Sequence, residues 1–223
     1  MLFNSQVTEI ARVVERFDDN ILKNETMLFS ADYNFARRNG DIITQSFLDK
    51  LPEDWKKSKI KIDSRVHMLM NDWYPCIPGW HHDDIPRTRS DRQPNYEKLD
   101  YESEHIMMVV NADVAPTQFI VGEINLDIPP VGSVIYDIWN REINTIIPHL
   151  NLFNIHLKEV EDCVVYHFDW QAFHRGTAAV KKGWRMFIRA SRYSDDVAFQ
   201  IRPYKNEIRR QAQVYLSALE AGW

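Results

Sequence analysis

Residues 184–193 read Trp-Arg-Met-Phe-Ile-Arg-Ala-Ser-Arg-Tyr, and this stretch decides the fold. Its alternation predicts a β-strand, because successive side chains of a strand point to opposite faces of a sheet. The apolar face, which we expect to pack in a core, consists of Trp184, Met186, Ile188 and Ala190. The other face carries Arg185, Phe187, Arg189 and Ser191. Arginine is rarely placed on an inner face without an anion to hold, so the segment also predicts a polar site.

The two arginines lie about 13 Å apart along such a strand, so one small carboxylate is not expected to span both. One of them is expected to hold a small anion. Arg189 has an alternative interpretation, in which it pairs with an internal Asp or Glu.

Further strand-like runs come before this segment, separated by turn residues. They cover 62–72, 105–111, 117–126, 132–138, 142–147, 155–160 and 163–169. Many short strands at regular spacing are typical of an antiparallel sandwich or barrel.

Helical patterns lie at both ends of the chain. Val7, Ile10, Ala11, Val14 and Phe17 have helical spacing over 5–17, and 31–58 is expected to be helical in part. The tail 204–221 places on one helical face Ile208, Ala212, Leu216 and Leu219. We therefore expect a mainly β fold with flanking helices in one domain over 1–223. Residues 1–60 would give helical support, 61–200 a β-barrel core, and 201–223 a closing helix.

Composition narrows the class of protein. The 223 residues are 44% hydrophobic and 26% charged, as in ordinary soluble domains. A net charge of -5 gives no footprint for general nucleic-acid binding. Two cysteines are too few for a disulfide scaffold, and neither a signal peptide nor a membrane-spanning run is evident. We expect a cytoplasmic protein that acts on a small molecule, without a membrane partner.

A second informative stretch is Trp80-His81-His82-Asp83-Asp84. In a strand, a His-x-Asp pair presents both side chains to one point. Two registers fit: His81 with Asp83, which we prefer, and His82 with Asp84. By itself the run favours a polar surface turn in which adjacent His and Asp pair with each other, because His-x-Asp occurs often by chance.

The interpretation as a metal site depends on a third ligand. The other histidines available are His67, His105, His149, His156, His167 and His174. His174 follows the strand-like run 163–169 and precedes the arginine-containing strand, so it is the preferred candidate. Two imidazoles and a carboxylate bind one face of iron(II) and leave the remaining positions open for chemistry.

These residues carry a family resemblance. His81-x-Asp83, His174, and arginines eleven and fifteen positions after His174 resemble the iron(II)/2-oxoglutarate-dependent oxygenases, over about 81–193. The Arg-x-x-x-Arg-Ala-Ser ending is similar to that of taurine dioxygenase and phytanoyl-CoA hydroxylase. The resemblance implies a double-stranded β-helix, a jelly-roll or cupin-like barrel.

The resemblance also implies roles for residues. His81, Asp83 and His174 would bind Fe(II), and 2-oxoglutarate would chelate the metal. Arg185 would hold the distal carboxylate, with Arg189 as second candidate and Ser191 or Thr117 as hydrogen-bonding helpers. Oxidative decarboxylation would release succinate and CO2 while the substrate is hydroxylated. The doubled His-His-Asp-Asp leaves the ligand register open.

The substrate is expected to lie near the long loop 85–103, which is rich in Pro, Arg and Asp. The substrate-side residues would be Trp80, Arg87 and Arg92. Two other classes compete with the oxygenase. One is a cupin-type metalloprotein, an isomerase or a dioxygenase independent of 2-oxoglutarate, and Arg185 and Arg189 weigh against it. The other is a non-catalytic β-barrel binding module.

Overall fold

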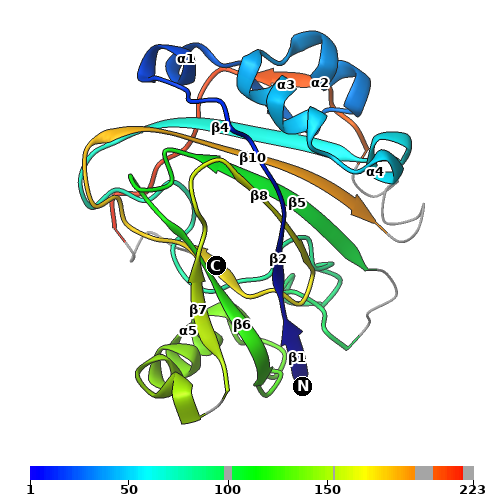
Figure 1. Ribbon diagram of the computed structural model, residues 1–223. Coiled ribbons are helices and arrows are strands. Elements are labelled where there is room, and N and C mark those ends of the chain that lie inside the picture. The colour runs from blue at the N-terminus through cyan, green and yellow to red at the C-terminus, as the bar shows by residue number, and fades with distance from the viewer. Residues whose placement is uncertain (98–101, 153, 194–202, 218–223) are drawn as a thin grey trace.

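The computed structural model describes residues 1–97, 102–152, 154–193 and 203–217, and its fold is mainly antiparallel β (Figure 1). The strands are β1 (Leu2–Ser5), β2 (Val7–Arg12), β3 (Met27–Phe29), β4 (Lys61–Leu69), β5 (Ser103–Val110), β6 (Thr117–Asn125), β7 (His156–Glu159), β8 (Val164–Asp169), β9 (His174–Gly176), β10 (Gly183–Tyr193) and β11 (Glu207–Arg209). The helices are α1 (Asp19–Asn24), α2 (Tyr33–Asn39), α3 (Ile42–Asp49), α4 (Glu53–Lys57), α5 (Ile135–Ile146) and the 3-10 segment η1 (Ile147–Leu152).

Most of the described strands form two sheets. The larger has the order β2-β8-β5-β10-β4; the smaller contains β1, β6, β7 and β9; β11 and β3 form a separate pair. The two sheets meet through apolar side chains, as where the rings of Phe119 on β6 and Phe168 on β8 lie 5.0 Å apart. In the described part of the chain the strands do not close into a barrel.

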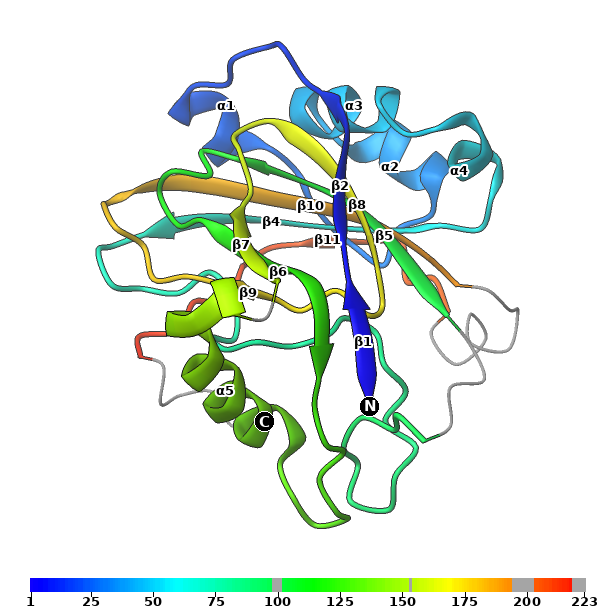
Figure 2. The ribbon, with the colours of Figure 1, turned by 60° about the horizontal axis from the view of Figure 1, so that its bottom comes forward.

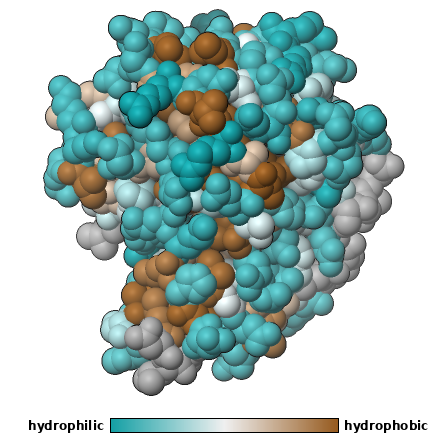
Figure 3. Space-filling view, in the orientation of Figure 1, coloured by the Kyte–Doolittle hydropathy of each residue, from teal (hydrophilic) through white to brown (hydrophobic). Residues whose placement is uncertain are grey.

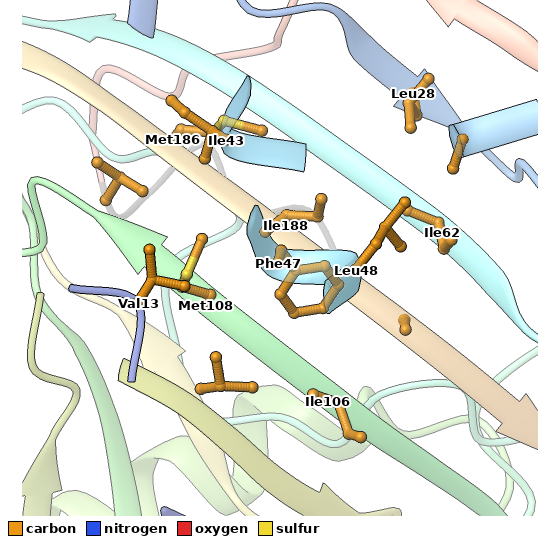
Figure 4. Close-up of a cluster of buried hydrophobic side chains, with 14 of the residues drawn as sticks. Val13, Leu28, Ile43, Phe47, Leu48, Ile62, Ile106, Met108, Met186 and Ile188 are labelled. Carbon is orange, nitrogen blue, oxygen red and sulfur yellow. The ribbon is translucent and has the colours of Figure 1, made fainter. Parts of the chain in front are cut away.

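The outer face of the larger sheet is covered by helices α1 to α4 (Figure 1). Met186, Ile188 and Ala190 of β10 are fully buried there, as the alternation of this segment predicted. They pack with Phe47 and Leu48 of α3 in the core that Figure 4 shows. The arginine-containing face of β10 therefore looks toward the smaller sheet.

The strands expected at 132–138 and 142–147 are wrong, because this segment forms α5. Its buried residues are Ile135, Tyr136, Trp139 and Ile143, which lie on one helical face. The ring of Trp139 packs on Phe3 and Phe173, at 5.4 and 5.7 Å between centroids. Short pieces of this isoleucine-rich segment resemble strands. The helical spacing of its buried residues is recognisable only over the whole length of α5.

The helix expected at 5–17 is also wrong, because this segment contains the last residue of β1 and the whole of β2. The register of β2 against β8 shifts between Glu9 and Ala11, which is a β-bulge. An inserted residue breaks the two-residue alternation, and here the broken pattern imitated helical spacing. Residues 1–60 thus contribute strands as well as helical support.

The closing helix expected at 204–221 is not formed within residues 203–217, and the rest of that range lies outside the described residues. Instead β11, which is labelled in Figure 2, pairs with β3. Tyr215 forms a bridge with Tyr74. Pairing with an available strand edge outweighs the amphipathic pattern of this segment. The helices expected within 31–58 and the strands at 62–72, 105–111, 117–126, 155–160, 163–169 and 184–193 are confirmed within two or three residues at each end. A single domain over 1–223 stays a prediction.

Hydrophilic side chains cover most of the face in Figure 3. Within the described residues, the helices are too short or too polar to span a lipid bilayer.

Candidate metal centre

Two histidines from distant parts of the chain are joined through their backbones. His81 N donates to His174 O at 3.0 Å, and His174 N donates to His81 O at 3.1 Å. Their rings lie 4.6 Å apart between centroids. His174 begins β9, whereas His81 forms an isolated bridge instead of the expected strand. The chain turns away soon afterwards, where Asp84 adopts a positive φ of 57°.

Both rings are oriented in the same way. Nδ1 of His81 lies 2.9 Å from Gly79 O, and Nδ1 of His174 lies 2.9 Å from Ala172 O. A carbonyl accepts, so each Nδ1 carries the proton and each Nε2 is the unprotonated ring nitrogen. This arrangement fixes the tautomer that a metal-binding imidazole requires.

The local backbone is set by Gly79, whose φ is 112°. Asn140 of α5 lies against this glycine, where a Cβ would overlap it, and its side-chain oxygen accepts from Trp80 N. The helix thereby holds the segment that leads into His81.

Asp83 completes the group. Its Oδ2 lies 3.2 Å from His174 Nε2, and one ligand atom from each of His81, Asp83 and His174 lies within 4.8 Å of the others. Around a metal with bonds of about 2.1 Å, neighbouring ligand atoms are about 3 Å apart, so the aspartate and His174 already have suitable spacing. The donor set suits iron(II).

The charges of the group are also those of metal ligands. Burial, and then His174, lowers the pKa of His81 to about 4, so this imidazole is neutral at pH 7. Burial alone would raise the pKa of Asp83, but the nearby Arg189 and His174 hold it well below its usual range. The group therefore offers a neutral His81 imidazole and an ionised Asp83 carboxylate.

The other register is directed elsewhere. His82 is buried among aromatic rings, with its centroid 3.8 Å from that of Phe173 and Nδ1 2.8 Å from Tyr96 OH. Asp84 Oδ2 accepts from Tyr193 OH at 3.1 Å. The structure thus brings His81 and Asp83, and neither His82 nor Asp84, toward His174.

The two arginines of β10 differ in their partners. Arg189 forms an ion pair with Asp83 and lies 3.6 Å from Asp84, so it has the internal carboxylates that the sequence allowed. Arg185 is only 2% exposed and donates to Ala115 O at 2.9 Å and to Thr117 Oγ1 at 2.8 Å. Among the described residues it contacts no carboxylate, and burial lowers its pKa to about 10. Arg185 therefore carries a buried positive charge whose partners in the described structure are neutral oxygens.

Ser191, expected to help an arginine bind the co-substrate, forms its hydrogen bond with His105 instead. Its Oγ is 2.9 Å from His105 Nδ1, and Ser103 Oγ is 3.2 Å from His105 Nε2. The sequence named His105 and Ser191 for other roles, and it singled out neither Ser103 nor the contact of the two serines with His105. The signal was present in Ser103 and His105, which occupy the inward positions of a strand.

The residues expected on the substrate side are separated by the fold. The ring of Trp80 is fully buried, with the Arg175 guanidinium 4.4 Å above it. Arg87 and Arg92 are exposed on the following loop, where Arg87 donates to Arg92 O at 3.4 Å. Positions 98–101 of that loop lie outside the described residues. A surface hollow of about 400 Å³ adjoins Gly79 and Arg175.

No protein-family model matches the chain, and no curated protein matches it. Among solved structures, the chain is similar to EvdO2 from Micromonospora carbonacea var. aurantiaca, crystallised with 2-oxoglutarate. The identity is 8% and the TM-score 0.32, over 61% of this chain. The chain spans about half the length of EvdO2, 52% of it.

Proposed function

We propose that the protein is a non-haem Fe(II)- and 2-oxoglutarate-dependent oxygenase that hydroxylates a small molecule in the cytoplasm and releases succinate and CO2. The observation that carries the proposal is the convergence of His81, Asp83 and His174 at the sheet face that also carries Arg185, a buried arginine with no carboxylate partner among the described residues. The facing sheets are compatible with a double-stranded β-helix, which is part of the proposal.

His81, Asp83 and His174 would hold the iron. When bound, iron and 2-oxoglutarate supply oxygen activation coupled to loss of CO2. The backbone bridge between the two histidines fixes their separation, and the carbonyls of Gly79 and Ala172 fix their rings. The three residues leave part of the metal's coordination sphere for other ligands.

Arg185 would bind the distal carboxylate of 2-oxoglutarate, with Thr117 as its neutral partner. An unpaired buried charge is costly, and a carboxylate in this place would provide the missing counter-charge. Arg189 would act differently, by orienting Asp83 and keeping it ionised. The assignment of the two arginines thus follows from their different partners.

The test is anaerobic addition of Fe(II) and 2-oxoglutarate to the metal-free protein. The expected result is the weak visible charge-transfer band of a chelated keto acid, followed by succinate when air is admitted. Absence of both the band and succinate contradicts the proposal. Metal binding without 2-oxoglutarate binding would favour the cupin-type alternative instead.

A further inference from the structure

The inner face of the larger sheet carries a third arginine close to the metal centre. Arg65 of β4 lies directly opposite Phe187 of β10 in the antiparallel register. Directly opposed residues share a face of the sheet, so Arg65 lies on the same face as Arg185 and Arg189. None of the roles proposed above uses it.

Arg65 is surrounded mainly by positive charge. It is half-buried, and among the described residues it forms no hydrogen bond or ion pair. Burial lowers the pKa of Arg65, and the cations of Arg209 and Arg189 lower it further. Among the described residues, the carboxylate that acts on Arg65 is that of Asp63, whose Oδ1 lies 3.4 Å from Arg209 and already accepts from Ser30 N.

The charges around the centre do not balance. Among the described residues, four guanidinium groups lie near this centre, those of Arg65, Arg185, Arg189 and Arg209, and three carboxylates lie there with them, those of Asp63, Asp83 and Asp84. A bound metal dication and a 2-oxoglutarate dianion cancel each other's formal charge. Among these described groups, one positive charge therefore remains unbalanced after both have bound.

The C-terminal segment lies beside this part of β4, where Arg209 is 3.4 Å from Asp63. Arg209 is the last residue of β11. Tyr74 N donates to Tyr215 O at 2.8 Å, and Tyr215 N donates to Tyr74 O at 3.0 Å. Tyr215 lies close enough to Arg65 to feel its charge. A small group held between β4 and this segment would lie beside Arg189, which touches the proposed metal ligand Asp83.

We propose that Arg65 and Arg209 form a subsite for an oxyanion of the substrate, a carboxylate, phosphate or sulfonate, next to the metal centre. Its role in substrate binding rests on the oxygenase function proposed above. Guanidinium groups suit such oxyanions because their planar N–H donors match the acceptor geometry. The subsite is distinct from that of the co-substrate, because Arg185 lies elsewhere on the face and bonds Thr117.

The experiment is calorimetric titration with inorganic phosphate and with acetate at low ionic strength. Each is added to the metal-free protein, and to protein loaded with Mn(II) and 2-oxoglutarate. Arg65→Gln and Arg209→Gln are each expected to weaken binding of the preferred anion about tenfold or more, because each removes a charge-assisted contact. Arg65→Lys is expected to retain part of the affinity. The matched control is Arg12→Gln. Arg12 is an exposed arginine of β2 that pairs with Glu161, and its replacement should leave the anion affinity unchanged.

The two anion sites are separated by a crossed comparison. Arg185→Gln should abolish binding of 2-oxoglutarate and leave binding of the small anion unchanged. Arg65→Gln should weaken binding of the small anion and leave binding of 2-oxoglutarate unchanged. Preference for acetate assigns a carboxylate, and preference for phosphate assigns a phosphate or sulfonate; either ranking supports the subsite. Unchanged anion affinity in Arg65→Gln, or an equal loss in Arg12→Gln, overturns it. Should Mn(II) and 2-oxoglutarate fail to bind while anion binding still depends on Arg65, the oxygenase proposal falls and the anion site stands.

Discussion

Replacing His105 by glutamine gives a sharp test of how the site is built. The His105 side chain is fully buried between two serine hydroxyls. Burial, and then the charge of Arg189, lowers its pKa to about 3. The folded protein therefore holds this imidazole neutral at pH values where an unfolded chain would protonate it.

The sign and size of the effect follow from this difference. An unperturbed histidine has a pKa of about 6.5, so below that pH the unfolded chain takes up a proton that the folded chain refuses. The stabilisation by His105 is complete above about pH 6.5 and is lost as the pH falls toward 3. At about 1.4 kcal/mol per pH unit, the loss between pH 7 and pH 5 is about 2 kcal/mol.

The assay is urea denaturation of the metal-free protein at pH 7 and pH 5. His105→Gln should lose about 2 kcal/mol less than the wild type between these pH values. The buried His67 and His81, whose pKa values are lowered to about 3 and about 4, add acid sensitivity in the same direction to both proteins. The exposed His156 is the control, and His156→Gln should follow the wild type. Equal pH losses in His105→Gln and the wild type would refute the reasoning.

Three further results are expected. His174→Ala should weaken Fe(II) or Mn(II) binding more than about 100-fold by equilibrium dialysis, since even indirect support of a ligand accounts for 10–100-fold; His82→Gln should keep the metal, and the reverse outcome would assign the other register. Gly176→Ala should cost about 1–3 kcal/mol of unfolding free energy, because its Cβ would overlap Cys76 Sγ; adding Cys76→Ala should restore most of it, and no restoration would locate the strain elsewhere. Ile188→Ala, at a fully buried position, should cost about 2–5 kcal/mol in urea, and a loss below about 1 kcal/mol would contradict the packing on the helices.

The larger sheet was the predictable part of the fold. Residues 184–193 alternate without interruption because β10 is a central strand with one apolar and one polar face. Where alternation was broken, as by the bulge between Glu9 and Ala11, the local pattern favoured a helix. The prediction for the segment that forms α5 was wrong for the opposite reason, because its isoleucines favour strands. Its helical face is stabilised by Trp139 packing on Phe3 and Phe173, which lie far away in the sequence.

The site was predictable in kind and less so in detail. Spacing indicated a His-x-Asp pair and a distant histidine, but both registers of His-His-Asp-Asp have the same period. Their difference arises from the aromatic surroundings of His82, which come from segments far apart in the chain. Arg65 was not singled out because its significance depends on Arg209, which the C-terminal segment brings to it. Such long-range contacts leave no local trace in a sequence.

The backbone bridge between His81 and His174 separates two tasks that proteins often combine. The spacing of the histidines depends on main-chain hydrogen bonds, and the loop that follows is closed on itself by Asn95 N donating to Pro86 O at 2.7 Å. Arg89 and Asp91 tie this loop to the segment before α5, since Arg89 Nη1 donates to Pro129 O at 3.0 Å and Asp91 accepts from Gly132 N at 2.7 Å. The exposed Arg87, Ser90 and Arg92 are therefore the loop positions at which protein engineering can vary the sequence while the backbone bridge between His81 and His174 stays in place.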